Sequence, residues 1–95
     1  MSLNEYEVKI TPVIMSILAT LWKGNHGDHD LSKSIWFDSK HAYMITLTNE
    51  ADFMLQRITS EPDTFVPLLT VNDGVGNVSE AIDIISRRIE LDIKK

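Results

Sequence analysis

The sequence predicts an α+β fold in which an antiparallel four-stranded sheet carries helices on one face. Three observations predict it: an alternating N-terminal segment, an apolar hairpin between two amphipathic stretches, and a buried strand before a last helix. The predicted element order is β-α-β-β-α-β-α. Its first six elements match the ferredoxin-like arrangement, and the C-terminal helix is an addition that is free to cover the other face or bind a partner.

The first two predicted elements are a strand and a helix. Residues 4–10 alternate between polar and apolar side chains, which indicates a half-buried strand. Thr11 and Pro12 then suit the start of a helix that ends at Gly24. If residues 4–10 are helical instead, the order becomes α-β-β-α-β-α, a two-layer α+β domain with the hairpin at its centre.

The hairpin, residues 34–48, is apolar on both sides, so its register decides which side chains share a face. A three-residue loop leaves Trp36 and Met44 on one face and puts five others on the opposite face: Ile35, Phe37, Tyr43, Ile45 and Leu47. With a two- or four-residue loop, Trp36 joins Tyr43, Ile45 and Leu47. We favour the three-residue loop, in which the face of Trp36 and Met44 needs a cover from the last helix or from another chain.

The second half of the chain is predicted as helix, strand and helix. Thr48 and Asn49 offer an N-cap for a helix over residues 50–60, with Phe53 opposite its apolar stripe. Residues 65–71 read as a buried strand in which Pro67 favours an edge position or a bulge. The last helix, residues 78–93, leaves two apolar side chains well off its core face, namely Ile84 and Leu91.

Composition bounds the class of protein. A length of 95 residues predicts one domain, spanning 1–95, with a single modest core. The net charge of −5, with 9 Lys and Arg against 14 Asp and Glu, disfavours nucleic acid and anionic membranes as partners. The chain has no Cys, so thiolate metal sites, disulfides and a Cys nucleophile are excluded. No secretion signal precedes the apolar run of residues 13–22, and we expect a cytoplasmic protein.

Two loops contain residues that bind ligands in other proteins. His26, Asp28 and His29, with His41 from the hairpin turn, supply the nitrogen and oxygen ligands of a divalent metal, although their spacing matches no established metal motif. Residues 72–77 form a Gly-rich turn before a helix, as phosphate sites do, but the Lys of a P-loop is missing. We expect no cofactor, and a metal- or ligand-responsive module that uses residues 26–30 is the alternative hypothesis.

The sequence favours protein binding over catalysis. No nucleophile stands beside a base in a known catalytic motif, so an enzyme would need a site shared between subunits. Several apolar side chains are left outside the predicted core, and such groups mark interfaces. The candidate interface residues are Trp36, Met44, Phe53, Ile84 and Leu91. We therefore expect a small acidic protein-binding or regulatory protein, of the accessory, inhibitor or immunity type, that forms a homodimer.

Overall fold

The structure is a computed structural model that describes residues 3–24, 30–37, 40–59, 64–72 and 78–94, with side chains described from residue 10 onward. Along the sequence, one helix precedes the four strands and one helix follows them. The elements are α1 (Leu3–Gly24), β1 (Leu31–Trp36), β2 (Ala42–Leu47), β3 (Phe53–Ile58), β4 (Phe65–Val71) and α2 (Val78–Lys94).

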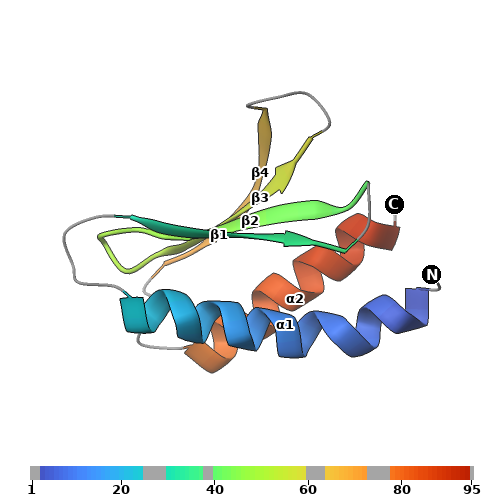
Figure 1. The fold of residues 1–95 in the computed structure, drawn as a ribbon, viewed down its shortest axis with the longest axis horizontal. Coiled ribbons are helices and arrows are strands. Elements are labelled where there is room, and N and C mark those ends of the chain that lie inside the picture. The colour runs from blue at the N-terminus through green and yellow to red at the C-terminus, as the bar shows by residue number, and fades with distance from the viewer. Residues whose placement is uncertain (1–2, 25–29, 38–39, 60–63, 73–77, 95) are drawn as a thin grey trace.

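The predicted fold class is confirmed. The protein is α+β, with one four-stranded antiparallel sheet and two helices that lie side by side under one face of it (Figure 1). The strand order is β1-β2-β3-β4, so each strand pairs with its neighbours in sequence. In this meander α2 lies beside α1, and no described helix lies on the other face of the sheet (Figure 1).

The order of the elements along the chain differs from the prediction in two segments. The N-terminal segment belongs to a helix, as in the alternative order, and residues 53–58 form a strand where a helix was predicted. The observed order is therefore α-β-β-β-β-α. The sheet keeps four strands, because a strand is lost at the N-terminus and one is gained in mid-chain. The described helices are two instead of the predicted three, because the predicted mid-chain helix is the strand β3.

Helix α1 continues through Pro12, where the sequence predicted a helix start. One buried stripe holds it: Ile10 and Ile14 are four residues apart and so are Ile14 and Leu18, with Leu21 one turn later. A helix that starts at Pro12 would leave Ile10 outside this stripe. Packing of the stripe therefore outweighs the backbone hydrogen bond that proline cannot donate.

Strand β3 was mistaken for a helix because it is apolar on both faces. Phe53 and Leu55 are fully buried on the helix side of the sheet, while Met54 and Ile58 alternate to the opposite side. Apolar groups at positions 54, 55 and 58 also fit the spacing of a helix. The predicted helix cap is therefore wrong: the Thr48 hydroxyl accepts hydrogen bonds from backbone N–H groups two and four residues on, but they close a turn that leads into β3.

The favoured hairpin register is confirmed. Ile35 lies opposite Tyr43, and the backbone N–H of Phe37 donates to the carbonyl of His41 at 2.9 Å, so three residues separate this last pair. Ile35 and Tyr43 consequently face the helices, and Trp36 lies on the opposite side. The aromatic rings of Phe37 and Tyr43 meet edge to face, with centroids 6.0 Å apart, at that end of the hairpin.

The core lies between the sheet and the two helices. Its largest fully buried side chains come from α1, β2, β3 and α2, so every layer contributes to it. They are Ile10, Ile14, Leu18, Tyr43, Ile45, Leu47, Phe53, Leu55, Ile85 and Ile89. The described core cluster lies on one side of the sheet, and among the described strand residues that face the other side only Ala42 is buried.

The turn between β2 and β3 holds a strained residue. Ala51 has a φ of 68°, in the left-handed region that costs side chains with a Cβ atom. Its N–H donates to the carbonyl of Thr48 at 3.0 Å, and the N–H of Thr48 donates to the carbonyl of Asp52 at 2.9 Å. These bonds hold the turn closed against the backbone strain.

We expect Ala51→Gly to stabilise the fold by about 0.5–1 kcal/mol, because glycine adopts a positive φ without the Cβ clash. Chemical denaturation of the two proteins, followed by circular dichroism, measures the difference. Ala51→Val is the matched variant and should destabilise the fold, since a β-branched side chain tolerates this φ least. A loss of stability in the glycine variant would contradict the assignment of strain to this residue.

Candidate interaction surface

The side of the sheet that faces away from the helices, called here the outer face, consists of three rows of paired residues. The strand register defines each row from β1 to β4, since directly paired residues share a face. The rows are Trp36, Ala42, Ile58 and Phe65; Ser34, Met44, Gln56 and Pro67; and Ser32, Thr46, Met54 and Thr70. The first row is apolar throughout, and the other two mix apolar with small polar side chains.

No residue of the outer face carries a charge, although 24% of the whole chain is charged. A solvated face of an antiparallel sheet is normally polar, with apolar groups turned to the core. The hydroxyls of Ser32 and Thr46 lie 2.8 Å apart and satisfy each other. The apolar row, together with Met44 and Met54, therefore leaves apolar surface on the outer face that burial against another surface would remove from water.

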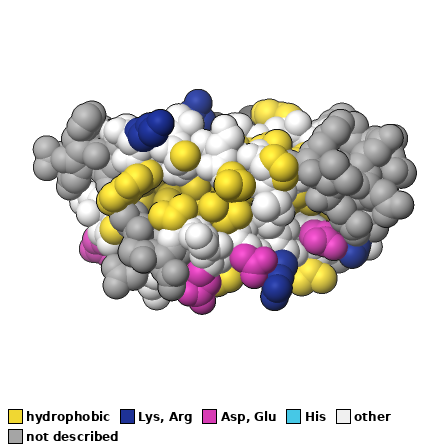
Figure 2. Space-filling model, turned by 90° about the horizontal axis from the view of Figure 1, so that it is seen from below, with side chains coloured by type: hydrophobic (Ala, Val, Ile, Leu, Met, Phe, Trp, Pro, Cys, Tyr) yellow, Lys and Arg dark blue, Asp and Glu magenta, His cyan; other side chains and the backbone are white. Residues whose placement is uncertain are grey.

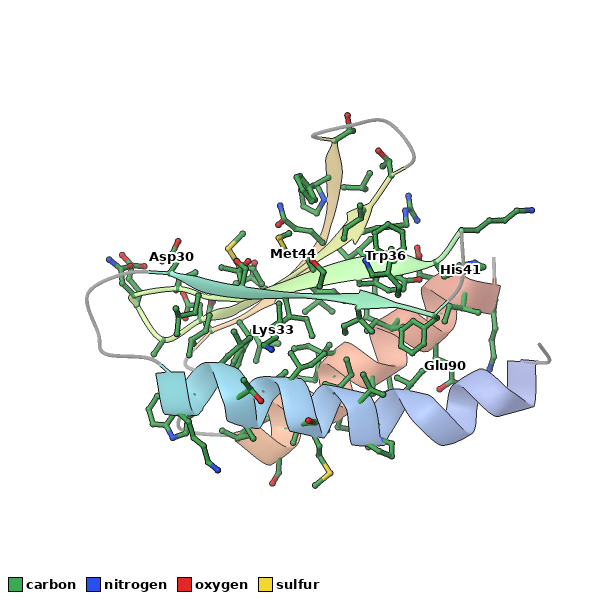
Figure 3. All side chains as sticks on the ribbon, viewed as in Figure 1. Asp30, Lys33, Trp36, His41, Met44 and Glu90 are labelled. Carbon is green, nitrogen blue, oxygen red and sulfur yellow. The ribbon has the colours of Figure 1, made fainter. Side chains whose placement is uncertain are left out.

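The most prominent groups of the outer face are aromatic. Trp36 is 64% exposed and Phe65 is 39% exposed, and they stand at opposite ends of the apolar row, on β1 and β4. Figure 3 shows Trp36 and Met44 on the side of the sheet away from the helices and Lys33 on the helix side. Large rings with few rotatable bonds are the side chains that most often anchor protein interfaces.

Both edges of the sheet carry features that oppose the addition of another strand. In β1, Lys33 pairs with Ile45 and so lies on the helix side of an edge strand, where an inward charge opposes strand addition. In β4, Pro67 lacks an N–H, and the register shifts opposite Leu55 and Gln56. Pro67 was predicted at an edge position or a bulge: the edge position is confirmed, and the irregularity in the register lies next to Pro67. Neither edge of the sheet is thus well suited to pair with a strand of another chain.

The helix layer also exposes apolar groups, but among charges. Figure 2 looks onto this layer and shows hydrophobic side chains across its middle, with acidic and basic groups around them. Ile84 and Leu91 are exposed on α2, which carries ion pairs from Arg87 to Asp83 and from Lys94 to Glu90. On α1, Met15 and Trp22 are exposed.

The structure separates the predicted interface residues. Trp36 and Met44 lie on the outer face, while Ile84 and Leu91 lie on α2 in the opposite layer. Phe53 was placed wrongly: it is fully buried in the core, because its segment is a strand that turns this side chain toward the helices. Sequence reasoning missed Ile58 and Phe65: the pairing of β2 with β3 brings Ile58 into the row of Trp36, and the pairing of β3 with β4 brings in Phe65.

The predicted metal ligands are not assembled in the part of the chain that is described. His26, Asp28 and His29 lie outside the described residues, as does most of the Gly-rich turn over residues 72–77. Of the predicted ligands only His41 is described, just before β2. Within the described ranges no three His, Asp or Glu side chains are grouped to hold a metal ion.

A buried polar cluster joins α2 to the sheet. The Asp92 side chain is 2% exposed; its carboxylate accepts a hydrogen bond from the Tyr43 hydroxyl at 2.8 Å and pairs with the Arg57 guanidinium at 2.5 Å. A buried carboxylate requires such donors. Because the three residues come from β2, β3 and α2, the cluster fixes how α2 docks on the sheet. Its geometry indicates a structural role.

We expect Tyr43→Phe to destabilise the fold by about 1–2 kcal/mol, because Asp92 stays buried with one donor fewer. Urea denaturation of the variant and the parent chain measures the loss. Arg87→Ala is the control, since it breaks an ion pair whose side chains are 75% and 59% exposed, and such pairs contribute about 0.5 kcal/mol or less. Equal effects of the two substitutions would contradict the role given to the cluster.

Ser86 offers a complementary test on the same helix. Its Oγ is buried and has no hydrogen-bond partner among the described residues. We expect Ser86→Ala to leave stability unchanged or to raise it by up to about 1 kcal/mol, because the substitution removes an unsatisfied polar atom and alanine favours helices. The same denaturation series measures it, and a loss above about 1 kcal/mol would show that this hydroxyl has a partner in solution.

Comparison with known proteins finds no matching family model, no matching curated protein and no matching solved structure. In the described part of the chain, neither helix combines the length and the hydropathy needed to cross a bilayer. Any assignment of function therefore depends on the surfaces of this chain.

Proposed function

We propose that this chain is a small acidic protein-binding protein of the regulatory kind, an accessory, inhibitor or immunity protein, and that it acts in the cytoplasm as a homodimer. The outer face carries the proposal. Its residues form a continuous uncharged surface with two exposed aromatic side chains, Trp36 and Phe65, and no described helix covers it. Contiguous apolar patches on small chains are most often protein interfaces.

The distribution of charge supports both parts of the proposal. The chain carries a net charge of −5, yet the outer face has none of its charged residues. Two copies that meet through the outer face keep their acidic groups away from the contact, so their like charges repel only weakly. The charged surface outside that contact stays available to a target of opposite charge, as accessory and inhibitor proteins require.

The two tryptophans allow a matched test. We expect Trp36→Glu to raise the dissociation constant of the homodimer at least tenfold, because it places an unpaired charge in a desolvated contact. Trp22→Glu changes the same residue type at a comparable exposure, 47% against 64%, but on the helix layer, and should leave the dimer intact. Size-exclusion chromatography with light scattering over a concentration series measures both.

The outcomes of this test are distinct. A parent chain that stays monomeric from micromolar to millimolar concentration would contradict the homodimer. If Trp22→Glu dissociates the dimer and Trp36→Glu does not, the interface lies on the helix layer and not on the outer face. Circular dichroism of both variants checks that each exposed substitution leaves the fold intact.

A further inference from the structure

The rows of the outer face carry information about how two copies meet. Two sheets that pack face to face keep their strands roughly aligned. With a twofold axis in the plane between them, only two aligned arrangements arise. An axis parallel to the strands places β1 over β4 of the second copy, and each row over the same row. An axis across the strands places β1 over β1, and the row of Trp36 over the row of Ser32.

We propose that the outer face is covered by the outer face of a second copy, with the twofold axis parallel to the strands, so that Trp36 of each copy lies against Phe65 of the other. This geometry rests on the proposed homodimer and specifies its contacts. It stacks the apolar row on itself, with the small Ala42 opposite Ile58 and the two aromatic side chains opposite each other.

The alternative axis makes poorer contacts. It would lay the exposed rings of Trp36 and Phe65 over the hydroxyl-bearing Ser32 and Thr70 at the other end of the sheet. The parallel axis keeps the rings together and matches hydroxyl-bearing side chains with each other and with the thioether of Met54. Apolar groups gain most when they desolvate one another, so the rows favour the parallel axis.

The occupant is a second copy for three reasons. The outer face has no charge with which to select a charged partner, whereas two uncharged faces complement each other. Lys33 on one edge strand and Pro67 on the other oppose growth of the sheet in its own plane. Two sheets of the same twist, related by an axis in their plane, also follow each other's curvature.

The area indicates a dimer of modest affinity. Four strands about 4.8 Å apart and six residues long cover a flat area of about 400 Å² per copy. The uneven surface made by the side chains adds to this area. The pair therefore buries on the order of 800 Å² or more, which is below the roughly 1,200–2,000 Å² of stable specific interfaces and in the range of weak, transient ones. We expect a dimer that forms in the micromolar range and dissociates on dilution.

Cysteine cross-linking tests the geometry, because the chain has no Cys of its own. Ser32→Cys and Thr70→Cys are conservative changes at exposed positions of β1 and β4, away from the row of Trp36. They are mixed and treated with a bifunctional thiol reagent that spans about 10 Å, the separation of packed sheets. Under the proposed axis the mixture should give a covalent dimer that joins position 32 to position 70.

Each single variant is its own control. Under the proposed axis, two copies of Ser32→Cys hold their thiols on β1 strands that are displaced sideways by three strand spacings, about 14 Å, and should not cross-link. Ser34→Cys alone tests the alternative arrangements. An axis across the strands, or pairing of the β1 edges of two copies, would bring position 34 of one copy close to position 34 of the other and allow a cross-link.

The results separate the two proposals. A covalent dimer from the mixture, with none from the single variants, supports the parallel axis. A parent chain that is dimeric by light scattering but gives no mixed product, or cross-links through Ser34→Cys, overturns this geometry and leaves the proposed homodimer standing. A parent chain that is monomeric throughout the concentration series overturns both.

Discussion

The alternation of side chains along four strands, with helices on one side only, constrains everything else in this molecule. Each strand turns half of its residues toward α1 and α2 and half away from them. The inner half, with both helices, forms the described core. The outer half has no helix to bury it among the described elements, yet it has no charge and carries two exposed aromatic groups. This mismatch between composition and exposure is what points to a partner surface.

The buried cluster of Tyr43, Arg57 and Asp92 explains why α2 is on the inner side. A helix with Asp92 on its buried face needs donors across from it, and β2 and β3 supply a hydroxyl and a guanidinium there. Desolvating a carboxylate without them would cost several kcal/mol, by order of magnitude. The cluster thus favours one docking position for α2, beside α1, and leaves the outer face open.

Features of the fold that depend on residues close together in the sequence could be predicted, and features that depend on contacts between separate elements could not. The three-residue hairpin loop, the edge position of Pro67 and the exposure of Ile84 and Leu91 follow from local pattern and are confirmed. Local pattern does not decide that residues 4–10 are helical or that residues 53–58 form a strand, because the spacing of apolar residues in each segment fits a helix as well as a strand. Of the candidate interface, Trp36 and Met44 were found from sequence, whereas Ile58 and Phe65 join them through the pairing of β2 with β3 and of β3 with β4.

By itself the sequence determined the α+β class, the apolar character of both sides of the hairpin, and the absence of cysteine chemistry. These depend on composition and on short-range periodicity. Only the tertiary structure decided that α2 lies beside α1, that Phe53 is in the core, and that the apolar row crosses all four strands. Those properties arise from contacts between residues far apart in the chain. A local pattern does not encode which of its two apolar faces the rest of the chain will cover.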